Sequence, residues 1–142
     1  MILLDTNVLS ELMKPAPEPV VIQWLDAQVD SQVFLTAVTK AEIELGISLL
    51  PNGKRKDMFT GLASALFDEF PDRILPFDAA AASYYANLVA NARNAAGRTL
   101  SVEDAQIAAI TQANQLTLAT RNSKDFEFIP DLSLINPWRI TG

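Results

Sequence analysis

Five short apolar segments, separated by stretches long enough for one or two helices, restrict the fold of this chain more than any other feature. They cover residues 2–4, 33–36, 73–77, 116–119 and 132–135. Strands that alternate with helices pair mainly in parallel, and the helices then cover both faces of the sheet. The sequence therefore predicts an α/β fold with a mainly parallel central sheet.

The stretches between these strands carry helical signals. A short helix follows Asp5, a second begins near Pro19, and others are expected at about 39–50, 54–70, 78–97 and 102–113. Asp78 suits the N-cap of its helix. Residues 120–125 form a polar loop in this interpretation. No linker, repeat or low-complexity run interrupts the 142 residues, so residues 1–142 are predicted to form one domain.

Histidine and cysteine are both absent from the chain. Their absence excludes a Ser-His-Asp triad, a histidine base, thiolate catalysis and disulfides within the chain. An enzyme built from this sequence must use carboxylates, hydroxyls, amides, Lys, Arg or Tyr. Any bound metal would have mainly oxygen ligands, which favours Mg²⁺, Mn²⁺ or Ca²⁺.

The formal net charge is −6. Such a charge argues against non-specific binding to nucleic acid over the whole surface, although a local positive rim is compatible with it. Candidates for nucleic-acid contacts on such a rim are Arg93, Arg98 and Arg121. No window approaches the roughly 18 apolar residues of a membrane helix, and no basic-then-apolar leader is present. We therefore expect a cytoplasmic protein that does not insert into a membrane.

Three acids follow strands or open helices, and each has two interpretations. Asp5 ends the first strand in MILLDTN, where it could cap a helix or bind a cation. Glu42 closes the segment TKAE, which has the form of a capping box, and Asp104 closes SVED, an acidic variant of it. Capping and chemistry remain open for each acid taken alone.

The positions of these acids favour a shared site. Ligands of parallel α/β sheets bind outside the carboxyl ends of the strands, which is where Asp5 falls. Clustered carboxylates raise one another's pKa unless a cation lies between them, and divalent cations prefer oxygen ligands. Such a cation polarises phosphoryl oxygens and lowers the pKa of bound water. We therefore expect a hydrolase that uses metal-activated water.

Four motifs together resemble one known family. MILLDTN, TKAEIELG, SVEDAQIAA and TLATRNSKDF, followed by INPW, are similar to motifs of the PIN-domain ribonucleases, in particular the VapC-type toxins of bacterial toxin–antitoxin pairs and their FitB-like branch. The resemblance extends from Met1 to Trp138. It implies a three-layer α/β/α sandwich and an Mg²⁺- or Mn²⁺-dependent endoribonuclease. It also implies a homodimer that joins a larger assembly with a DNA-binding antitoxin.

The resemblance also assigns residues. The catalytic acids and metal ligands would be Asp5, Glu42 and Asp104. Thr6, Asn7 and Thr120 would position ligands or the attacking water. Where many relatives have a fourth acid after the threonine–arginine pair, this chain has Asn122, which accepts hydrogen bonds but carries no charge. Asp125 either replaces that acid or is an ordinary loop residue, and the number of metal ions stays open with it.

Two other functions are compatible with the sequence. The first is a catalytically degenerate PIN-like module that only binds a partner protein; the presence of all three acids argues against it. The second is an aspartyl-phosphate phosphatase with Asp5 as its nucleophile. That chemistry usually needs a second acid two residues later, and Asn7 occupies the position.

Overall fold

The computed structural model describes residues 1–96 and 100–140, and in these ranges five strands form one parallel sheet. The strands are β1 (Ile2–Leu4), β2 (Val33–Thr36), β3 (Ile74–Leu75), β4 (Thr117–Ala119) and β5 (Ser133–Ile135). Their order across the sheet is β3-β2-β1-β4-β5, and each neighbouring pair is parallel. The predicted parallel sheet is confirmed.

Helices fill the connections between the strands. They are α1 (Thr6–Leu12), α2 (Pro19–Asp26), α3 (Ala37–Ser48), α4 (Lys54–Asp68), α5 (Ala79–Asn91), α6 (Val102–Ala113) and α7 (Ser123–Phe126). Two 3₁₀ turns (Asp30–Gln32 and Pro137–Arg139) and a π-helical turn (Ala92–Ala96) complete the described elements.

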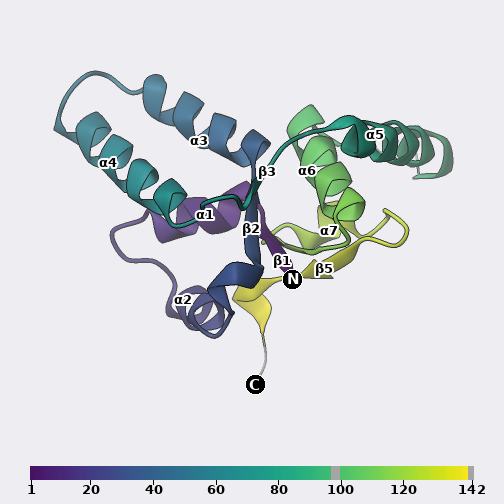
Figure 1. Ribbon diagram of the computed structural model, residues 1–142, viewed down its shortest axis with the longest axis horizontal. Helices are drawn as coiled ribbons and strands as arrows, with labels where there is room; N and C mark the ends of the chain where they lie inside the picture. Colours follow the sequence, from purple (N-terminus) through teal and green to yellow (C-terminus); the bar gives the residue numbers. More distant parts are fainter. Residues whose placement is uncertain (97–99, 141–142) are drawn as a thin grey trace.

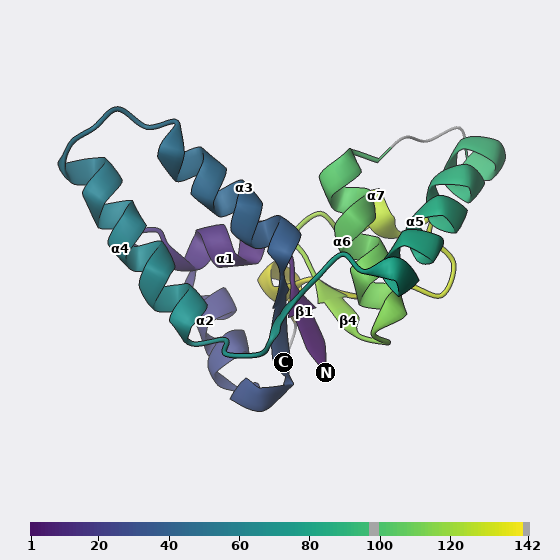
Figure 2. The same ribbon diagram turned by 45° about the horizontal axis from the view of Figure 1, so that its top comes forward.

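The helices lie on both faces of the sheet, as an α/β/α sandwich requires. Figures 1 and 2 show α1, α2, α3 and α4 on one side and α5, α6 and α7 on the other. Alternate side chains of a strand point to opposite faces, so Leu3 joins the core under α5 and α6 while Leu4 joins the core under α1 to α4. In the same way, Leu118 belongs to the core under α5 and α6, and Ala119 belongs to the core under α1 to α4.

The strand register places the first residues after β1, β2 and β4 together. Leu4 pairs with Ala119, so Asp5 and Thr120 leave the sheet side by side. Leu3 pairs with Phe34, which brings the end of β2 beside the same point. The carboxyl ends of these central strands therefore meet at one edge, although more than 110 residues separate β1 from β4 along the chain.

The structure differs from the expected elements in three places. Helix α3 begins at Ala37 rather than near residue 39, because Thr36 and not Thr39 is its N-cap. The third strand has only two residues, since Pro76 cannot donate a ladder hydrogen bond. The expected loop at 120–125 contains the start of α7. The predicted end of the alanine-rich helix at Gly97 lies outside the described residues.

The part of the chain that the structure describes contains no helix long and apolar enough to cross a bilayer.

Candidate active site

The Asp5 carboxylate lies at the carboxyl end of β1, where the chain turns into α1. Asp5 is 3% exposed. Its Oδ1 accepts a hydrogen bond from the Thr6 amide at 2.8 Å, which caps α1. Its Oδ2 accepts from Thr120 Oγ1 at 2.8 Å and from Asn7 Nδ2 at 3.3 Å. Asp5 is therefore a helix cap and a buried carboxylate at the sheet edge at once.

A small polar network ties the loop after β4 to α1. Asn7 donates to Thr120 Oγ1 at 3.2 Å and accepts at Oδ1 from the Arg121 amide at 3.1 Å. The Asn122 amide donates to Thr120 Oγ1 at 3.1 Å. Asn7 and Thr120 thus hold the Asp5 carboxylate in place through hydrogen bonds.

A chain of threonine hydroxyls leads to the Glu42 carboxylate. Thr6 Oγ1 donates to Glu42 Oε1 at 2.8 Å, and Thr6 Oγ1 and Thr39 Oγ1 are 2.9 Å apart. Because a hydroxyl has one proton, Thr39 must donate to Thr6. The distance from Thr36 Oγ1 to Thr39 Oγ1 is 3.3 Å, and both threonines are fully buried. The aligned hydroxyls polarise one another towards Glu42.

The capping interpretation of Glu42 is wrong. Thr36 is the N-cap of α3, and its side chain accepts from the Thr39 amide at 3.0 Å. Glu42 consequently lies in the second turn of the helix, where no free backbone amide is left for it to cap. The TKAE segment has the form of a capping box, but the last residue of β2 already caps the helix. Glu42 therefore has no structural reason to be acidic at this position.

Asp104 approaches the same pocket from the first turn of α6. Ser101 is the N-cap of this helix and accepts from the Asp104 amide at 3.1 Å, so the predicted cap is confirmed. Asp104 is half-buried and lines the cavity, whereas its neighbour Glu103 is exposed and does not line it. The cap fixes the backbone that carries Asp104, and the carboxylate of Asp104 remains available to the pocket.

The three acids share one cavity and affect one another's ionisation. The cavity has a volume of about 400 Å³ and is lined by Asp5, Thr6, Asn7, Ser10, Glu11, Lys14, Glu42, Asp104 and Arg121. Burial raises the pKa of Asp5 to about 6, with smaller increases from the charges of Asp104 and Glu42. Burial also raises the pKa of Glu42 and of Asp104, and neighbouring acids add to both effects.

The donor set suits a hard divalent cation. Such a cation prefers oxygen ligands, which the three acids offer. Its positive charge would also lower the raised pKa values of these acids. Within residues 1–96 and 100–140, however, no group of three acids is arranged to hold one metal ion directly. Mg²⁺ commonly uses one or two carboxylates and keeps several waters, so the arrangement fits that mode of binding better than a closed cage of carboxylates.

The remaining predicted residues are distributed around the pocket or away from it. Asp125 is exposed on α7, where its negative charge contributes to raising the pKa of Asp104, but it does not line the cavity. Asn122 precedes α7 without a side-chain capping bond. Arg121 lines the cavity, whereas Arg93 belongs to the π-helical turn after α5. Arg98 lies outside the described residues.

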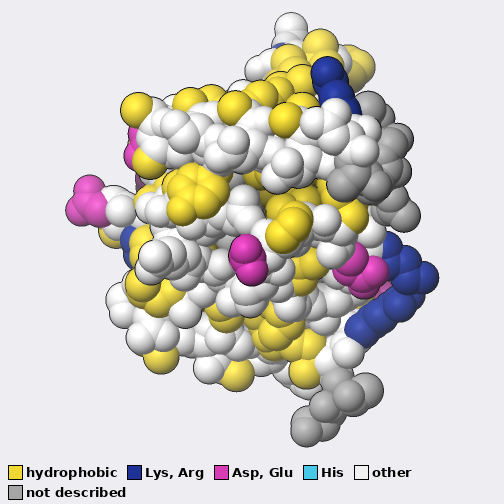
Figure 3. Space-filling view, turned by 90° about the vertical axis from the view of Figure 1, so that its right-hand side faces the viewer, with side chains coloured by type: hydrophobic (Ala, Val, Ile, Leu, Met, Phe, Trp, Pro, Cys, Tyr) yellow, Lys and Arg dark blue, Asp and Glu magenta, His cyan; other side chains and the backbone are white. Residues whose placement is uncertain are grey.

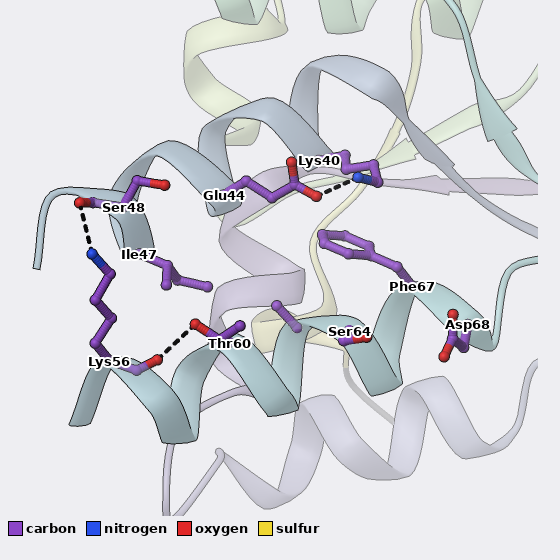
Figure 4. Close-up of a pocket in the computed structure, with 10 residues that line it drawn as sticks. Lys40, Glu44, Ile47, Ser48, Lys56, Thr60, Ser64, Phe67 and Asp68 are labelled. Carbon is purple, nitrogen blue, oxygen red and sulfur yellow. Dashed lines mark hydrogen bonds and ion pairs between the residues drawn. The ribbon is translucent and has the colours of Figure 1, made fainter. Parts of the chain in front are cut away.

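A second cavity, of about 410 Å³, lies between α3 and α4 and contains none of the three acids. Figure 4 shows Ile47 and Phe67 facing each other across it, with Lys40 bonded to Glu44 at one end and Lys56 bonded to the Ser48 carbonyl at the other. Of the charged residues that line it, Lys40 and Glu44 form an ion pair, and Lys56 bonds the neutral oxygens of Ser48 and Asn52. The groove therefore offers a surface for contact rather than a group of side chains suited to catalysis.

Sequence reasoning missed two parts of the site. Thr39 was interpreted as a helix cap, yet it is fully buried and bonds Thr6. Glu11 was not considered at all, yet it is 3% exposed and lines the acidic cavity. The sequence signal available for Glu11 was its spacing of three positions before Lys14, which allows the two side chains to pair.

These observations define an α/β protein with a parallel sheet and an acidic, cation-suited cavity that Asp5 after β1, Glu42 on α3 and Asp104 on α6 line together. The PIN domain family matches residues 2–131, and the chain belongs to this family.

Relatives and solved structures agree with this membership. The chain is 42% identical to Toxin FitB of Neisseria gonorrhoeae over 139 residues, which cover 97% of this chain and 99% of that protein. It is 40% identical to VapC ribonuclease Y4jK of Sinorhizobium fredii over 139 residues, covering 97% and 98% of the two chains. A structure of FitAB bound to an IR36 DNA fragment superposes with a TM-score of 0.91 at 39% identity, covering 100% of this chain and 99% of that one.

Proposed function

We propose that this protein is a metal-dependent endoribonuclease that acts as the toxin of a bacterial toxin–antitoxin pair. The convergence of Asp5, Glu42 and Asp104 on one cavity at the sheet edge carries the proposal. It is supported by relatives of nearly full-length overlap that are named as a toxin and as a VapC ribonuclease. The proposal includes a cytoplasmic location, because the RNA substrates of such an enzyme are in the cytoplasm.

The cofactor in this proposal is Mg²⁺ or Mn²⁺, held by Asp5 and Asp104 with help from Glu42. Bound there, the cation supplies Lewis acidity towards a phosphate and lowers the pKa of water. Asp5 is fixed for this role by its bonds from Thr6 and Thr120, so it needs no rearrangement to present its carboxylate. Such preorganisation is a main source of electrostatic catalysis.

Glu42 has a separate role in the proposal. Thr6 occupies its Oε1, and among the described residues no group donates to its Oε2. The free oxygen can accept the proton of an attacking water, and the raised pKa of Glu42 favours that acceptance. The threonine chain holds the carboxylate in one orientation while it does so. Thr6 and Thr39 are therefore positioning residues for Glu42.

The partner in this proposal is a small DNA-binding antitoxin. The FitAB structure that superposes on the chain is described as bound to DNA. A cavity with three uncompensated carboxylates is a natural target for an inhibitor's arginine, whose guanidinium fork matches a carboxylate with two hydrogen bonds. An inhibitor of this kind would occupy the place of the cation and close the pocket to RNA.

We also propose that the protein forms a homodimer through the side that carries α5 and α6. Phe77, Tyr84 and Val102 are exposed there by 36%, 43% and 56%. Figure 3 faces the side on which α5 lies, and apolar side chains spread over it between a few charged groups. Light scattering of the purified protein should give twice the monomer mass, and Tyr84→Glu should shift it towards the monomer.

Neither alternative function is favoured by an observation. A degenerate binding module would not need a hydroxyl chain aimed at Glu42. An aspartyl-phosphate phosphatase usually needs a second acid two residues after its nucleophile, and Asn7 occupies that position here.

Purified protein should cut a structured RNA at exposed single-stranded loops in the presence of Mg²⁺, because unstacked bases in loops are the part of RNA most open to proteins. Asp5→Asn, purified in the same way, controls for a contaminating nuclease and should be inactive. Equal cleavage by the wild type and Asp5→Asn would overturn the proposal. Cleavage of single-stranded DNA with no cleavage of RNA would also overturn it.

A further inference from the structure

The wall of the acidic cavity also carries two cations. Lys14 and Arg121 both line it, beside the acids on which the proposed cleavage depends. Lys14 lies two residues after Leu12, the last residue of α1. Arg121 follows Thr120 at the end of β4. A nucleic-acid strand that enters the cavity would therefore meet positive charge next to the acids.

Glu11 lies with these cations and differs from the other acids of the cavity. It is 3% exposed, and its carboxylate accepts from Lys14 Nζ at 2.9 Å and from the Glu18 amide at 3.0 Å. These bonds, together with the positive charges of Lys14 and Arg121, lower the pKa of Glu11, whereas burial raises that of Asp5, Glu42 and Asp104. Glu11 thus pairs with a cation through its carboxylate and differs in this from the three acids whose pKa values are raised.

The position of Arg121 is fixed from several sides, although its side chain is exposed. Its amide donates to Asn7 Oδ1 at 3.1 Å, and its carbonyl accepts from Asn136 Nδ2 at 3.2 Å. Its guanidinium carbon lies 5.1 Å from the centre of the Trp138 ring, a cation–π distance. Within the described part of the chain, the guanidinium itself makes no hydrogen bond. Its donors are therefore held at the cavity and free to bind a ligand.

We propose that Lys14 and Arg121 form a phosphate clamp that holds the RNA backbone beside the scissile bond, with Glu11 as the residue that positions the clamp. The inference rests on the proposed ribonuclease function and adds to it the way the substrate is held. Arginine and lysine are the usual ligands of backbone phosphates. The net charge of −6 repels RNA from the protein as a whole, so binding requires positively charged side chains at the place where the RNA lies.

Salt dependence separates a phosphate clamp from a structural ion pair. For single strands, the slope of log Kd against log salt changes by about 0.7 for each phosphate that the protein ceases to neutralise. Fluorescence anisotropy with a labelled single-stranded RNA should be measured in an Asp5→Asn background, so that no RNA is cut. We expect Lys14→Met and Arg121→Met each to weaken binding several-fold at low salt and to flatten the slope by about 0.7.

Two further variants refine the comparison. Lys54→Met removes one positive charge at the exposed start of α4, outside the cavity, and should leave the slope unchanged. Arg121→Lys keeps the charge but loses the stacking and the fork, so we expect it to keep the slope while weakening binding. Melting curves identify any variant that has lost its fold.

Glu11→Gln gives the sharpest test of the positioning role. Removing a negative charge should by itself strengthen RNA binding. If Glu11 positions the clamp, Glu11→Gln instead weakens binding and flattens the slope, against the sign of the charge change. Tighter binding by Glu11→Gln would overturn the positioning role. Slopes of Lys14→Met and Arg121→Met equal to that of Lys54→Met would overturn the clamp, even if the wild type cleaves RNA. Failure of the wild type to cleave RNA would count against the proposed function alone.

Discussion

The carboxylate of Asp5 carries out two tasks that the sequence presented as alternatives. Its Oδ1 caps α1, and its Oδ2 is held by Thr120 at the end of a strand more than 110 residues away. A cap on a solvent-exposed helix would not raise a carboxyl pKa. The burial that raises the pKa of Asp5 to about 6 comes from its place at the sheet edge, and this place makes it available to a cation.

The stability of the metal-free protein should therefore depend on the ionisation of Asp5. The folded state favours Asp5 in its protonated form, because its pKa is higher there than in the unfolded chain. The contribution of Asp5 to the free energy of unfolding is therefore full below about pH 3.8 and is lost as the pH rises through about 6. A shift of this size corresponds to about 3 kcal/mol. Asp5→Asn mimics the neutral form. In chelator, its stability relative to wild type should thus rise between pH 4 and pH 8, as measured by urea unfolding.

Asp26→Asn, at an exposed residue outside the cavity, controls for the loss of one negative charge. If Asp5→Asn is much less stable than the wild type at pH 8 without metal, Asp5 is chiefly a structural residue. A stability difference that does not vary with pH would mean that the carboxyl group is not buried in solution as it is here.

Glu42→Gln tests the second acid without disturbing a helix cap. Because Thr36 caps α3, the substitution should leave the melting temperature almost unchanged. The amide lacks the anion that binds a cation and accepts a proton, so single-turnover cleavage should fall by roughly two orders of magnitude, about 3 kcal/mol in transition-state terms. Both quantities should be measured on one preparation. Full activity would remove Glu42 from the site, and Asp125 would become the next candidate.

At the scale of single residues, the sequence predicted which types of residue form the site but not which side chains contact one another. Asp5, Glu42 and Asp104 could be selected because each follows a strand end or opens a helix. The bond from Thr6 to Glu42 joins residues 36 positions apart, and no local pattern contains it. The fixed place of Arg121 depends equally on Trp138, which the sequence presented only as part of a terminal motif.

At the scale of elements, helix N-termini position the acids. Ser101 caps α6 through the Asp104 amide at 3.1 Å, and Asp78 caps α5 through the Ala81 amide at 3.0 Å. Only the first of these caps borders the acidic cavity. A comparison of substitutions at Ser101 and Asp78 therefore separates the effect of a cap on stability from its effect on the site.

Ser101→Ala and Asp78→Ala should each destabilise the protein by about 1 kcal/mol. Ser101→Ala should also lower cleavage several-fold, because the backbone that carries Asp104 is then less well fixed. Asp78→Ala should leave cleavage unchanged, and Ser101→Asn should restore most of both losses. Chemical denaturation and single-turnover cleavage measure the two effects. Equal cleavage by Ser101→Ala and Asp78→Ala would show that the cap of α6 does not support the site.

The first residue of a helix could be predicted from the sequence where a local capping residue determines it. It could not be predicted where the end of a preceding strand determines it. Asp78, Pro19 and Ser101 all begin helices as the sequence indicated. The cap of α3 lies three residues before the one that TKAE suggested, because Thr36 ends β2 and caps the helix in the same residue. Strand pairing fixes Thr36, and strand pairing depends on residues far apart in the chain.

At the scale of the whole molecule, the strand order decides where the site forms. The central position of β1 between β2 and β4 gathers Asp5, Thr36 and Thr120 at one edge, and α3 and α6 bring Glu42 and Asp104 to it. The alternation of strands and helices predicted a parallel sheet, but it did not specify this order. The order follows from pairing between strands far apart in the chain, such as β1 with β4, which no local pattern contains.

In the proposed complex with an antitoxin, the acidic cavity should also govern inhibition. We expect the inhibitory segment to place an arginine between the carboxylates, so replacing that arginine by alanine should release cleavage in the reconstituted complex. Glu42→Gln in this protein should weaken the complex for the same reason, as measured by calorimetry. A complex that remains inhibited while its cavity is open and metal-loaded would refute this mode of silencing.

The dependence of cleavage on a divalent cation tests the central claim most directly. The purified wild-type protein should cut one defined RNA with Mg²⁺ or Mn²⁺, stop when EDTA is in excess, and resume when Mg²⁺ is restored. The three acids of the cavity offer oxygen ligands, and the chain has no histidine to act as a base in place of the cation. Single-turnover rates under the three conditions, with Asp5→Asn alongside, provide the measurement. Cleavage that continues undiminished in excess EDTA would contradict a metal-dependent mechanism.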